Sequence, residues 1–252
     1  EAGGPLLRTA ALHTRPSFRG NISWLWAVGA EPMDKAGKWV FNRPENIKAY
    51  EWFVDLRRRH KVVPGPDDTR GAFTGNGFLN GRAGLWLSFP NNLRELYSRP
   101  QLDWDIVPFP KALNGQRYTR ETADGMGLPE GGKQVDAAWN LVKWFCSGDA
   151  AKIFIKAGRA VPARRTAANS PDYLRPDTPQ HEENIVKALD YSRLQPVSLM
   201  FNDAEVIVRT YENAMFDEKE PMPVTAALNQ LQEVLEKLER DKARPASWEP
   251  RK

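Results

Sequence analysis

The stretch that decides the fold reads Phe78-Leu79-Asn80-Gly81-Arg82-Ala83-Gly84-Leu85-Trp86-Leu87-Ser88-Phe89-Pro90-Asn91-Asn92. A short helix is predicted to end at Gly81, since glycine readily takes the left-handed conformation that ends a helix. Residues 83–87 are apolar, few and bounded by turn residues, a pattern typical of a buried strand. The loop that follows carries a hydroxyl, an aromatic ring and two amides, on Ser88, Phe89, Asn91 and Asn92. Because ligands bind at the carboxyl ends of strands in α/β sheets, we expect this loop to contact a ligand.

The elements around this stretch alternate between short extended segments and amphipathic helices. Residues 103–110 read as a second short strand, ended by prolines that cannot donate to a ladder. Residues 6–12 are a further candidate strand, residues 21–30 a buried helix or an aromatic turn, and residues 35–39 a polar hairpin. Apolar residues at helical spacing predict helices at residues 44–60, 72–80, 132–146, 150–157, 182–189, 202–216 and 224–242. Asp149 can cap the fourth of these helices.

Composition narrows the function classes. The chain has 252 residues, of which 41% are hydrophobic and 27% charged, as expected of one large or two small globular domains. The net charge is only +4, and the basic residues lie among comparable numbers of acidic ones, so nucleic acid is not an expected partner. The basic run 57–61 is interpreted as a solvated helix end. No apolar run approaches the roughly 20 residues of a membrane helix.

A single cysteine, Cys146, rules out a disulfide within the chain and a cysteine-based zinc site. Its apolar neighbours predict a buried, inert thiol. The three histidines, His13, His60 and His181, lie far apart, and the sequence holds no nucleophile elbow, phosphate loop or zinc-protease motif. We therefore predict no metal and no cofactor. Nine tryptophans fit either a large core or an aromatic ligand cleft.

The order of several short blocks resembles the solute-binding proteins of bacterial ABC importers, in particular the carbohydrate type that includes maltose and glycerol-phosphodiester binders. The blocks are residues 24–37, 42–64, 78–88, 106–115, 125–127, 136–147 and 158–165. The last three read Gly125-Met126-Gly127, Ala137-Ala138-Trp139 leading to Phe145-Cys146-Ser147, and Gly158-Arg159-Ala160-Val161-Pro162-Ala163-Arg164-Arg165. The likeness runs through nearly the whole chain.

The resemblance implies an α/β fold, periplasmic-binding-protein-like (type II), in which two lobes close on a solute. On that plan residues 1–110 and 172–252 form the second (C-terminal) lobe. Residues 111–171 form a helical segment that returns into the first lobe, and the N-terminal part of that lobe is expected to lie outside this chain. A sugar or polyol, an ABC permease and the missing N-terminal lobe segment are the implied partners. The implied location is periplasmic or extracellular, with a lipid anchor as an option.

Eight residues are candidates for solute contact under this resemblance: Trp24, Ser88, Phe89, Asn91, Asn92, Asp124, Arg164 and Asp203. Sugar faces stack on aromatic rings, and hydroxyls need amide, carboxylate and guanidinium partners. Asn91 stands where the maltose binder has a stacking tryptophan, so the solute stays open. Each residue also has a structural interpretation: core packing for Trp24, turn chemistry for the asparagines, a solvent-facing turn for Asp124, a solvated basic loop for Arg164, and a first-turn helix acid for Asp203.

Two other functions stay open at this point. A glycosidase-like enzyme needs a pair of carboxylates that need not be close in sequence. A helical interaction module would use the leucine stripe at Leu228, Leu231, Leu235 and Leu238, which spans fewer than three heptads and is more typical of a helix packed on a core.

Overall fold

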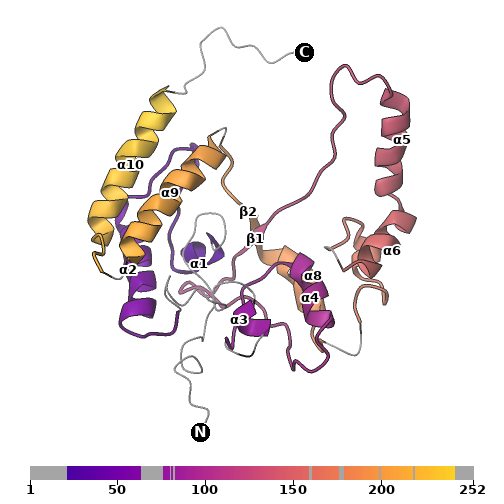
Figure 1. Cartoon of the computed structure of the whole chain (residues 1–252), viewed down its shortest axis with the longest axis horizontal. Coiled ribbons are helices and arrows are strands. Elements are labelled where there is room, and N and C mark those ends of the chain that lie inside the picture. The colour runs from indigo at the N-terminus through magenta and orange to yellow at the C-terminus, as the bar shows by residue number, and fades with distance from the viewer. Residues whose placement is uncertain are drawn as a thin grey trace. The chain divides into compact units, whose positions relative to one another are not determined.

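The computed structural model describes residues 22–63, 76–79, 81, 83–158, 161–175, 179–198, 200–217 and 219–241 (Figure 1). The chain divides into two compact units. Unit 1 comprises Glu1–Trp86, Lys111–Gln116 and Gln195–Lys252, and unit 2 comprises Leu87–Pro110 and Arg117–Leu194. The lobe boundaries expected from the sequence stay a prediction, and the candidate strand at residues 6–12 lies outside the described residues.

Unit 1 is helical in its described part. Its helices are α1 (Ile22–Ala27), α2 (Pro44–Arg58), α3 (Asn76–Leu79), α9 (Phe201–Phe216) and α10 (Val224–Asp241). The sequence signals at the ends of α2 are met, because Pro44 occupies the first turn and arginines the last. Gly81 follows α3 with φ of +69°, the left-handed conformation predicted for it. The buried helix α1 confirms the prediction for residues 21–30 where they are described.

The core of unit 1 forms where α10 packs on α2 and α9 (Figure 1). Leu228, Leu231 and Leu235 of α10 are fully buried there. Between α2 and α9, the buried Tyr50 hydroxyl donates a 3.0 Å hydrogen bond to Glu212. Burial, together with the Glu212 charge and this hydrogen bond, raises the pKa of Tyr50 well above its usual range. These three leucines of the stripe are therefore buried in the core of unit 1. The pattern had favoured this arrangement, an amphipathic helix packed on a core.

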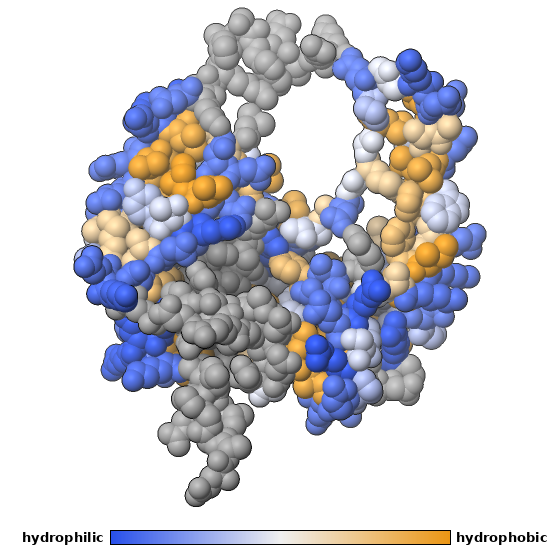
Figure 2. All heavy atoms as spheres, in the orientation of Figure 1, coloured by the Kyte–Doolittle hydropathy of each residue, from blue (hydrophilic) through white to orange (hydrophobic). Residues whose placement is uncertain are grey.

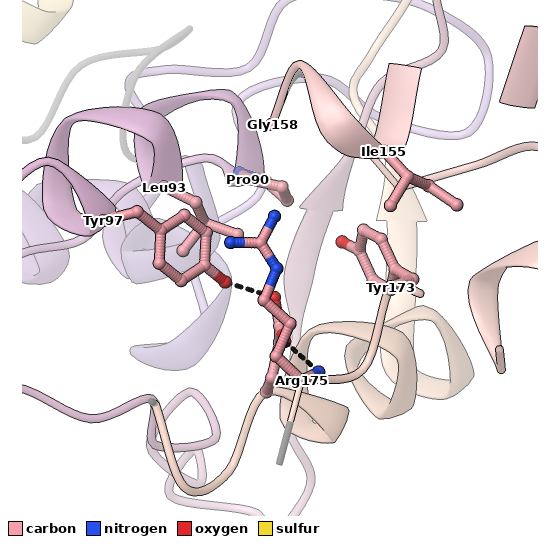
Figure 3. Close-up of a pocket in the computed structure, with 8 residues that line it drawn as sticks. Pro90, Leu93, Tyr97, Ile155, Gly158, Tyr173 and Arg175 are labelled. Carbon is pink, nitrogen blue, oxygen red and sulfur yellow. Dashed lines mark hydrogen bonds between the residues drawn. The ribbon is translucent and has the colours of Figure 1, made fainter. Parts of the chain in front are cut away.

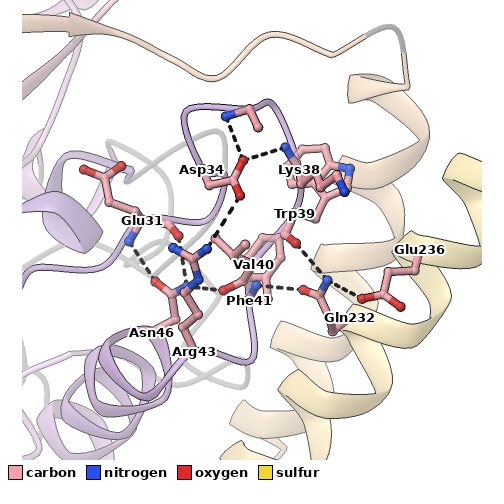
Figure 4. A network of polar contacts seen from close by, with 11 residues as sticks. Glu31, Asp34, Lys38, Trp39, Val40, Phe41, Arg43, Asn46, Gln232 and Glu236 are labelled. Atoms are coloured by element: carbon pink, nitrogen blue, oxygen red, sulfur yellow. Dashed lines mark hydrogen bonds and ion pairs between the residues drawn. The ribbon is translucent and has the colours of Figure 1, made fainter.

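A hairpin at residues 33–39 is fastened to both α2 and α10 (Figure 4). Met33 and Trp39 form an antiparallel bridge, which confirms the predicted hairpin. Asn46 of α2 donates to the carbonyls of Glu31 and Val40. On the other side, Gln232 of α10 is only 6% exposed. Its amide donates to the Trp39 carbonyl at 2.8 Å, and its oxygen accepts from the Phe41 backbone N–H at 2.9 Å.

Unit 2 is built from short elements. They are the 3-10 turn Pro90–Asn92, α4 (Leu93–Tyr97), β1 (Thr119–Glu121), α5 (Val135–Phe145), α6 (Gly148–Lys156), α7 (Arg165–Ala168), α8 (Glu183–Lys187), the 3-10 turn Ala188–Tyr191 and β2 (Ser192–Leu194). Strands β1 and β2 pair in parallel, with Thr119 opposite Ser192 and Glu121 opposite Leu194. The helix α6 is capped by Ser147, whose hydroxyl accepts from Ala150 N, so the expectation that Asp149 would be the cap is wrong. Gly158 ends it with φ of +64°, as predicted.

Apolar side chains of α5 and α6 remain on the surface, where Figure 2 shows them gathered in orange. Trp139 is 51% exposed and Ile153 is 55% exposed, and the exposed set also includes Val135, Leu141 and Trp144. Cys146, directly after α5, is exposed too, so the buried thiol expected from the sequence is wrong. The apolar pattern correctly predicted a helix, but this part of the structure provides nothing to cover its apolar face.

Neither segment predicted as a strand, residues 83–87 or residues 103–110, forms a strand among the described residues. In residues 83–87 only Trp86 has a bridge conformation and Leu85 is 50% exposed, although Ala83 is buried. Residues 103–110 form no ladder. Their carbonyls are satisfied by side chains instead: Asn184 donates to Ile106 O at 2.8 Å, and Arg117 Nε donates to Phe109 O at 2.8 Å. The apolar pattern favoured a strand, but strand pairing depends on a partner elsewhere in the fold.

None of the helices in the described part of the chain combines the length and apolar content that crossing a bilayer requires. Within the same residues, no group of three or more His, Cys, Asp or Glu side chains is placed to hold a metal ion.

Candidate functional site

The loop at residues 88–92 reaches the candidate site in unit 2 through Pro90, whereas Ser88, Phe89, Asn91 and Asn92 are not among the lining residues. Pro90 starts its 3-10 turn, because a proline fits the first turn of a helix that needs no N–H donor. Asn92 Nδ2 donates to Ser88 Oγ at 2.8 Å, so two of the predicted ligand residues are hydrogen-bonded to each other across the loop. Asn91 is exposed. The loop leads directly into α4, which brings Leu93, Arg94 and Tyr97 to the rest of the site.

Phe89 is stacked against a cation from β1. The ring is 37% exposed, and the Arg120 guanidinium lies 4.5 Å from its centroid. Such a cation–π contact contributes about 0.5–2 kcal/mol, depending on how far it is desolvated. One residue along β1, Glu121 accepts a 2.6 Å hydrogen bond from Ser192 of β2. Sequence reasoning missed Arg120, because no local pattern links it to a ring 31 positions away.

A small polar pocket lies behind this loop, between α4, α6 and the residues that precede α8 (Figure 3). Glu182 is 3% exposed and accepts hydrogen bonds from the Tyr97 hydroxyl and, at 2.7 Å, from the Arg175 backbone N–H. The Arg175 guanidinium lies 4.2 Å from the centroid of the Tyr97 ring. The volume left inside is about 10 Å³, room for about one water molecule. The inner pocket is therefore filled by its own side chains.

The two tyrosines of this pocket are held in their neutral form. Burial, followed by the hydrogen bond and the charge of Glu182, raises the pKa of Tyr97 above its usual range. Burial and then the Glu182 charge raise the pKa of Tyr173 in the same way. Tyr173 is 6% exposed, and in the part of the chain that the structure describes its hydroxyl has no hydrogen-bond partner. Both hydroxyls are thus donors, and one is still available.

The pocket opens into a wider groove of about 290 Å³. This is close to the lower end of the range for small-molecule sites, about 300–1,000 Å³. Its lining shares Tyr97, Gly158 and Arg175 with the pocket and adds Arg94, Lys156 and Ala157. The groove therefore offers cationic donors beside a tyrosine ring that the Arg175 guanidinium covers on one side. Apart from Gly158, which was predicted to end a helix, none of these groove residues was singled out from the sequence, because α4, α6 and the segment before α8 meet only in three dimensions.

The other predicted site residues are not among those that line this groove. Trp24 and Asp203 belong to unit 1, where Trp24 of α1 lies 6.5 Å from the Trp52 ring and Asp203 is exposed in the first turn of α9. In unit 2, Asp124 is exposed in the irregular segment after β1. Arg164 Nε donates to the Cys146 carbonyl at 2.7 Å, which ties the start of α7 to the end of α5. Contact of any of these residues with a solute stays a prediction.

Comparison with known proteins identifies the family. The sequence profile of the bacterial extracellular solute-binding proteins matches residues 19–152. The chain belongs to this family. The match spans the Phe78–Asn92 stretch and α5, so the resemblance seen in the sequence blocks is confirmed. No curated protein sequence matches the chain significantly.

Solved structures confirm the periplasmic-binding-protein-like, type II fold class. An ABC substrate-binding protein from Listeria monocytogenes in complex with cycloalternan has a TM-score of 0.79 at 19% identity, with 92% of this chain and 59% of that chain covered. Maltose-bound MalE3 of T. maritima has a TM-score of 0.73 at 19% identity, with 91% of this chain and 61% of that chain covered. UgpB from Mycobacterium tuberculosis in complex with glycerophosphocholine has a TM-score of 0.70 at 14% identity, with 93% of this chain and 59% of that chain covered. The chain thus spans about three fifths of the length of these structures.

Proposed function

We propose that this chain captures a small solute of the sugar or polyol class and delivers it to the permease of an ABC importer. The observation that carries the proposal is the open groove of unit 2, in a chain of the solute-binding family. Arg94, Lys156 and Arg175 offer donors to the hydroxyl oxygens of a sugar or polyol. The two structures cited above with cycloalternan and maltose support the sugar class.

Capture without chemistry is the simplest role for this groove. Its one buried carboxylate, Glu182, is already occupied by the Tyr97 hydroxyl and the Arg175 backbone N–H. A glycosidase needs a second carboxyl group about 5–10 Å away across the scissile bond, and the residues that line the pocket and groove include no other acid. We infer that the chain is a binding protein and acts outside the cytoplasmic membrane, in keeping with its family.

Unit 2 also needs a covering partner. The apolar face of α5 and α6, with Trp139 and Ile153 about half exposed, is larger than scattered surface residues would give. We infer that polypeptide not present among the described elements packs on it, whether from the same protein or from a separate one. Fluorescence of the apolar dye ANS measures how much of this face is exposed. Dye binding should fall when the covering polypeptide is added. It should fall to the same extent in Trp139→Gln.

A thermal-shift screen of sugars and polyols tests the capture. A solute at a hundred times its dissociation constant stabilises the folded state by about 2.7 kcal/mol. In a chain of this size that corresponds to a rise of roughly 5–10 °C in melting temperature. The screen should be run on this chain and on any longer form of the protein. If neither form shows a shift with any sugar or polyol, capture of this solute class is refuted.

Two further measurements separate the alternatives. Incubation of the chain with each solute that shifts the melting temperature, followed by chromatography, should return the solute unchanged, whereas a product would point to an enzyme. Delivery is tested by adding the solute-loaded chain to an ABC permease that transports the same solute, reconstituted in proteoliposomes. ATP hydrolysis should rise with the loaded chain and not with solute alone.

A further inference from the structure

The groove of unit 2 has an excess of positive charge. Arg94 of α4, Lys156 at the end of α6 and Arg175 line it together. None of the three forms an ion pair within the part of the chain that the structure describes. The only acid that lines the adjoining pocket, Glu182, accepts its hydrogen bonds from Tyr97 and from a backbone N–H. Three cations beside one occupied carboxylate leave a net positive cavity, which attracts anions.

The cations are brought together by a close approach of two helices. The end of α6 reaches α4 at Gly158, where an added Cβ would lie 3.4 Å from Arg94 Cβ. With φ of +64° as well, this position favours glycine. The approach sets Arg94 and Tyr97 beside Lys156. The backbone does not contribute donors here, because the N–H groups of Ala157 and Gly158 are bonded to carbonyls of α6. An anion in the groove would therefore be held by side chains.

A second, independent feature points to a ligand. The Tyr173 hydroxyl is buried, neutral and without a hydrogen-bond partner among the described residues. Figure 3 shows it turned toward the space beside the Arg175 guanidinium. A buried hydroxyl that makes no hydrogen bond has lost its contacts with water without a replacement, which is unfavourable. An acceptor oxygen brought in by a ligand would replace those contacts, so the hydroxyl and the cations favour the same kind of group.

We propose that this groove binds the phosphate group of a small solute, with Arg94, Lys156 and Arg175 as charge partners. The Tyr173 hydroxyl lines the adjoining pocket, which has room for about one water-sized group, and is an additional donor to a single phosphate oxygen that enters it. A phosphate ester carries a charge of about −1.5 to −2 and three strong acceptor oxygens, which matches several donors better than a carboxylate does. This inference deepens the proposed function and rests on it, because it assigns the class of solute that the same groove takes.

Isothermal titration of the whole chain tests this with five probes: inorganic phosphate, glycerol 3-phosphate, glycerol, gluconate and maltose. Glycerol 3-phosphate should bind more tightly than glycerol or gluconate, and inorganic phosphate should compete with it. Raising sodium chloride from about 50 to about 500 mM should weaken the binding of glycerol 3-phosphate, because salt screens exposed charges.

Substitutions then assign the binding to this groove. Arg175→Gln and Tyr173→Phe should each weaken binding of glycerol 3-phosphate about tenfold or more, as expected for a hydrogen bond to a charged group. Tyr173→Phe removes only an oxygen that has no partner, so the fold should be retained. Arg209→Gln is the matched control: this arginine lies in unit 1, is 65% exposed and pairs with Glu205, so its loss should leave binding unchanged.

Each alternative result has a defined meaning. Binding of maltose or glycerol without binding of either phosphate would overturn the phosphate assignment and leave solute capture intact. Tighter binding of gluconate than of glycerol 3-phosphate would replace phosphate with a carboxylate and overturn the assignment too. Phosphate binding that is equally weakened by Arg209→Gln, or unaffected by Arg175→Gln and Tyr173→Phe, would place it elsewhere. No binding of any probe would count against this inference and the proposed function together.

Discussion

Gln232→Ala is the sharpest test of how the hairpin at residues 33–39 is held in unit 1. The side chain is 6% exposed and satisfies two buried backbone groups, the Phe41 N–H at 2.9 Å and the Trp39 carbonyl at 2.8 Å. Removing it leaves both without a partner, at about 1–3 kcal/mol each. Water that enters the space vacated by the amide would recover part of this cost, so we expect a loss of about 2–4 kcal/mol in the free energy of unfolding.

Gln230→Ala on the exposed face of the same helix is the matched control. Both variants gain the same small increment of helix propensity, a few tenths of a kcal/mol, which cancels in the difference between them. Urea unfolding followed by circular dichroism gives that difference, and amide exchange at Phe41 should speed up only in Gln232→Ala. A difference below about 0.5 kcal/mol with unchanged Phe41 exchange would refute the reasoning, because it would mean that the buried amide holds nothing in place.

Three further predictions concern the core, a surface pair and a thiol. Leu231→Ala should lower the free energy of unfolding by about 2–5 kcal/mol in urea titrations, while Val234→Ala on the same helix, at 37% exposure, should cost far less. The Asp105 hydrogen bond, then its charge, raises the pKa of His181 above 6.5, so the stabilisation by this pair is present below pH 6.5 and is lost as the pH rises through the raised pKa. An NMR titration should show that pKa falling in Asp105→Asn, and an unchanged pKa would contradict the pairing. Cys146 is exposed and should react with a thiol reagent in the folded protein, whereas labelling only after denaturation would show that it is covered.

The interaction-module interpretation of the leucine stripe is not favoured, because Leu228, Leu231 and Leu235 are fully buried within unit 1. A change such as Leu231→Asp would place a charge in that core and unfold the unit, so it cannot serve as a clean probe of self-association. The Asn92–Ser88 hydrogen bond likewise shows that turn chemistry uses at least one of the two asparagines predicted to contact a solute.

Local periodicity was enough to predict the long helices, whereas the short helices α4 and α7 were not predicted. The ranges 44–60, 202–216 and 224–242 agree with α2, α9 and α10 to within two residues, because each has a continuous apolar face and a clear stop. The hairpin at residues 33–39 and the left-handed glycines at 81 and 158 follow from equally local rules. The order of the sequence blocks indicated the family, which the profile match confirms.

The tertiary structure alone decided which extended segments pair, which apolar faces are covered and which side chains meet in the groove. Residues 103–110 were expected to form a strand, yet Asn184 and Arg117 satisfy the Ile106 and Phe109 carbonyls in place of a neighbouring strand. Arg94, Lys156 and Arg175 carry no shared motif and converge because α4 meets α6 at Gly158. The physical reason is range: helix formation and turns depend on neighbours a few residues apart, whereas ladders, buried faces and binding sites depend on contacts between residues tens of positions apart.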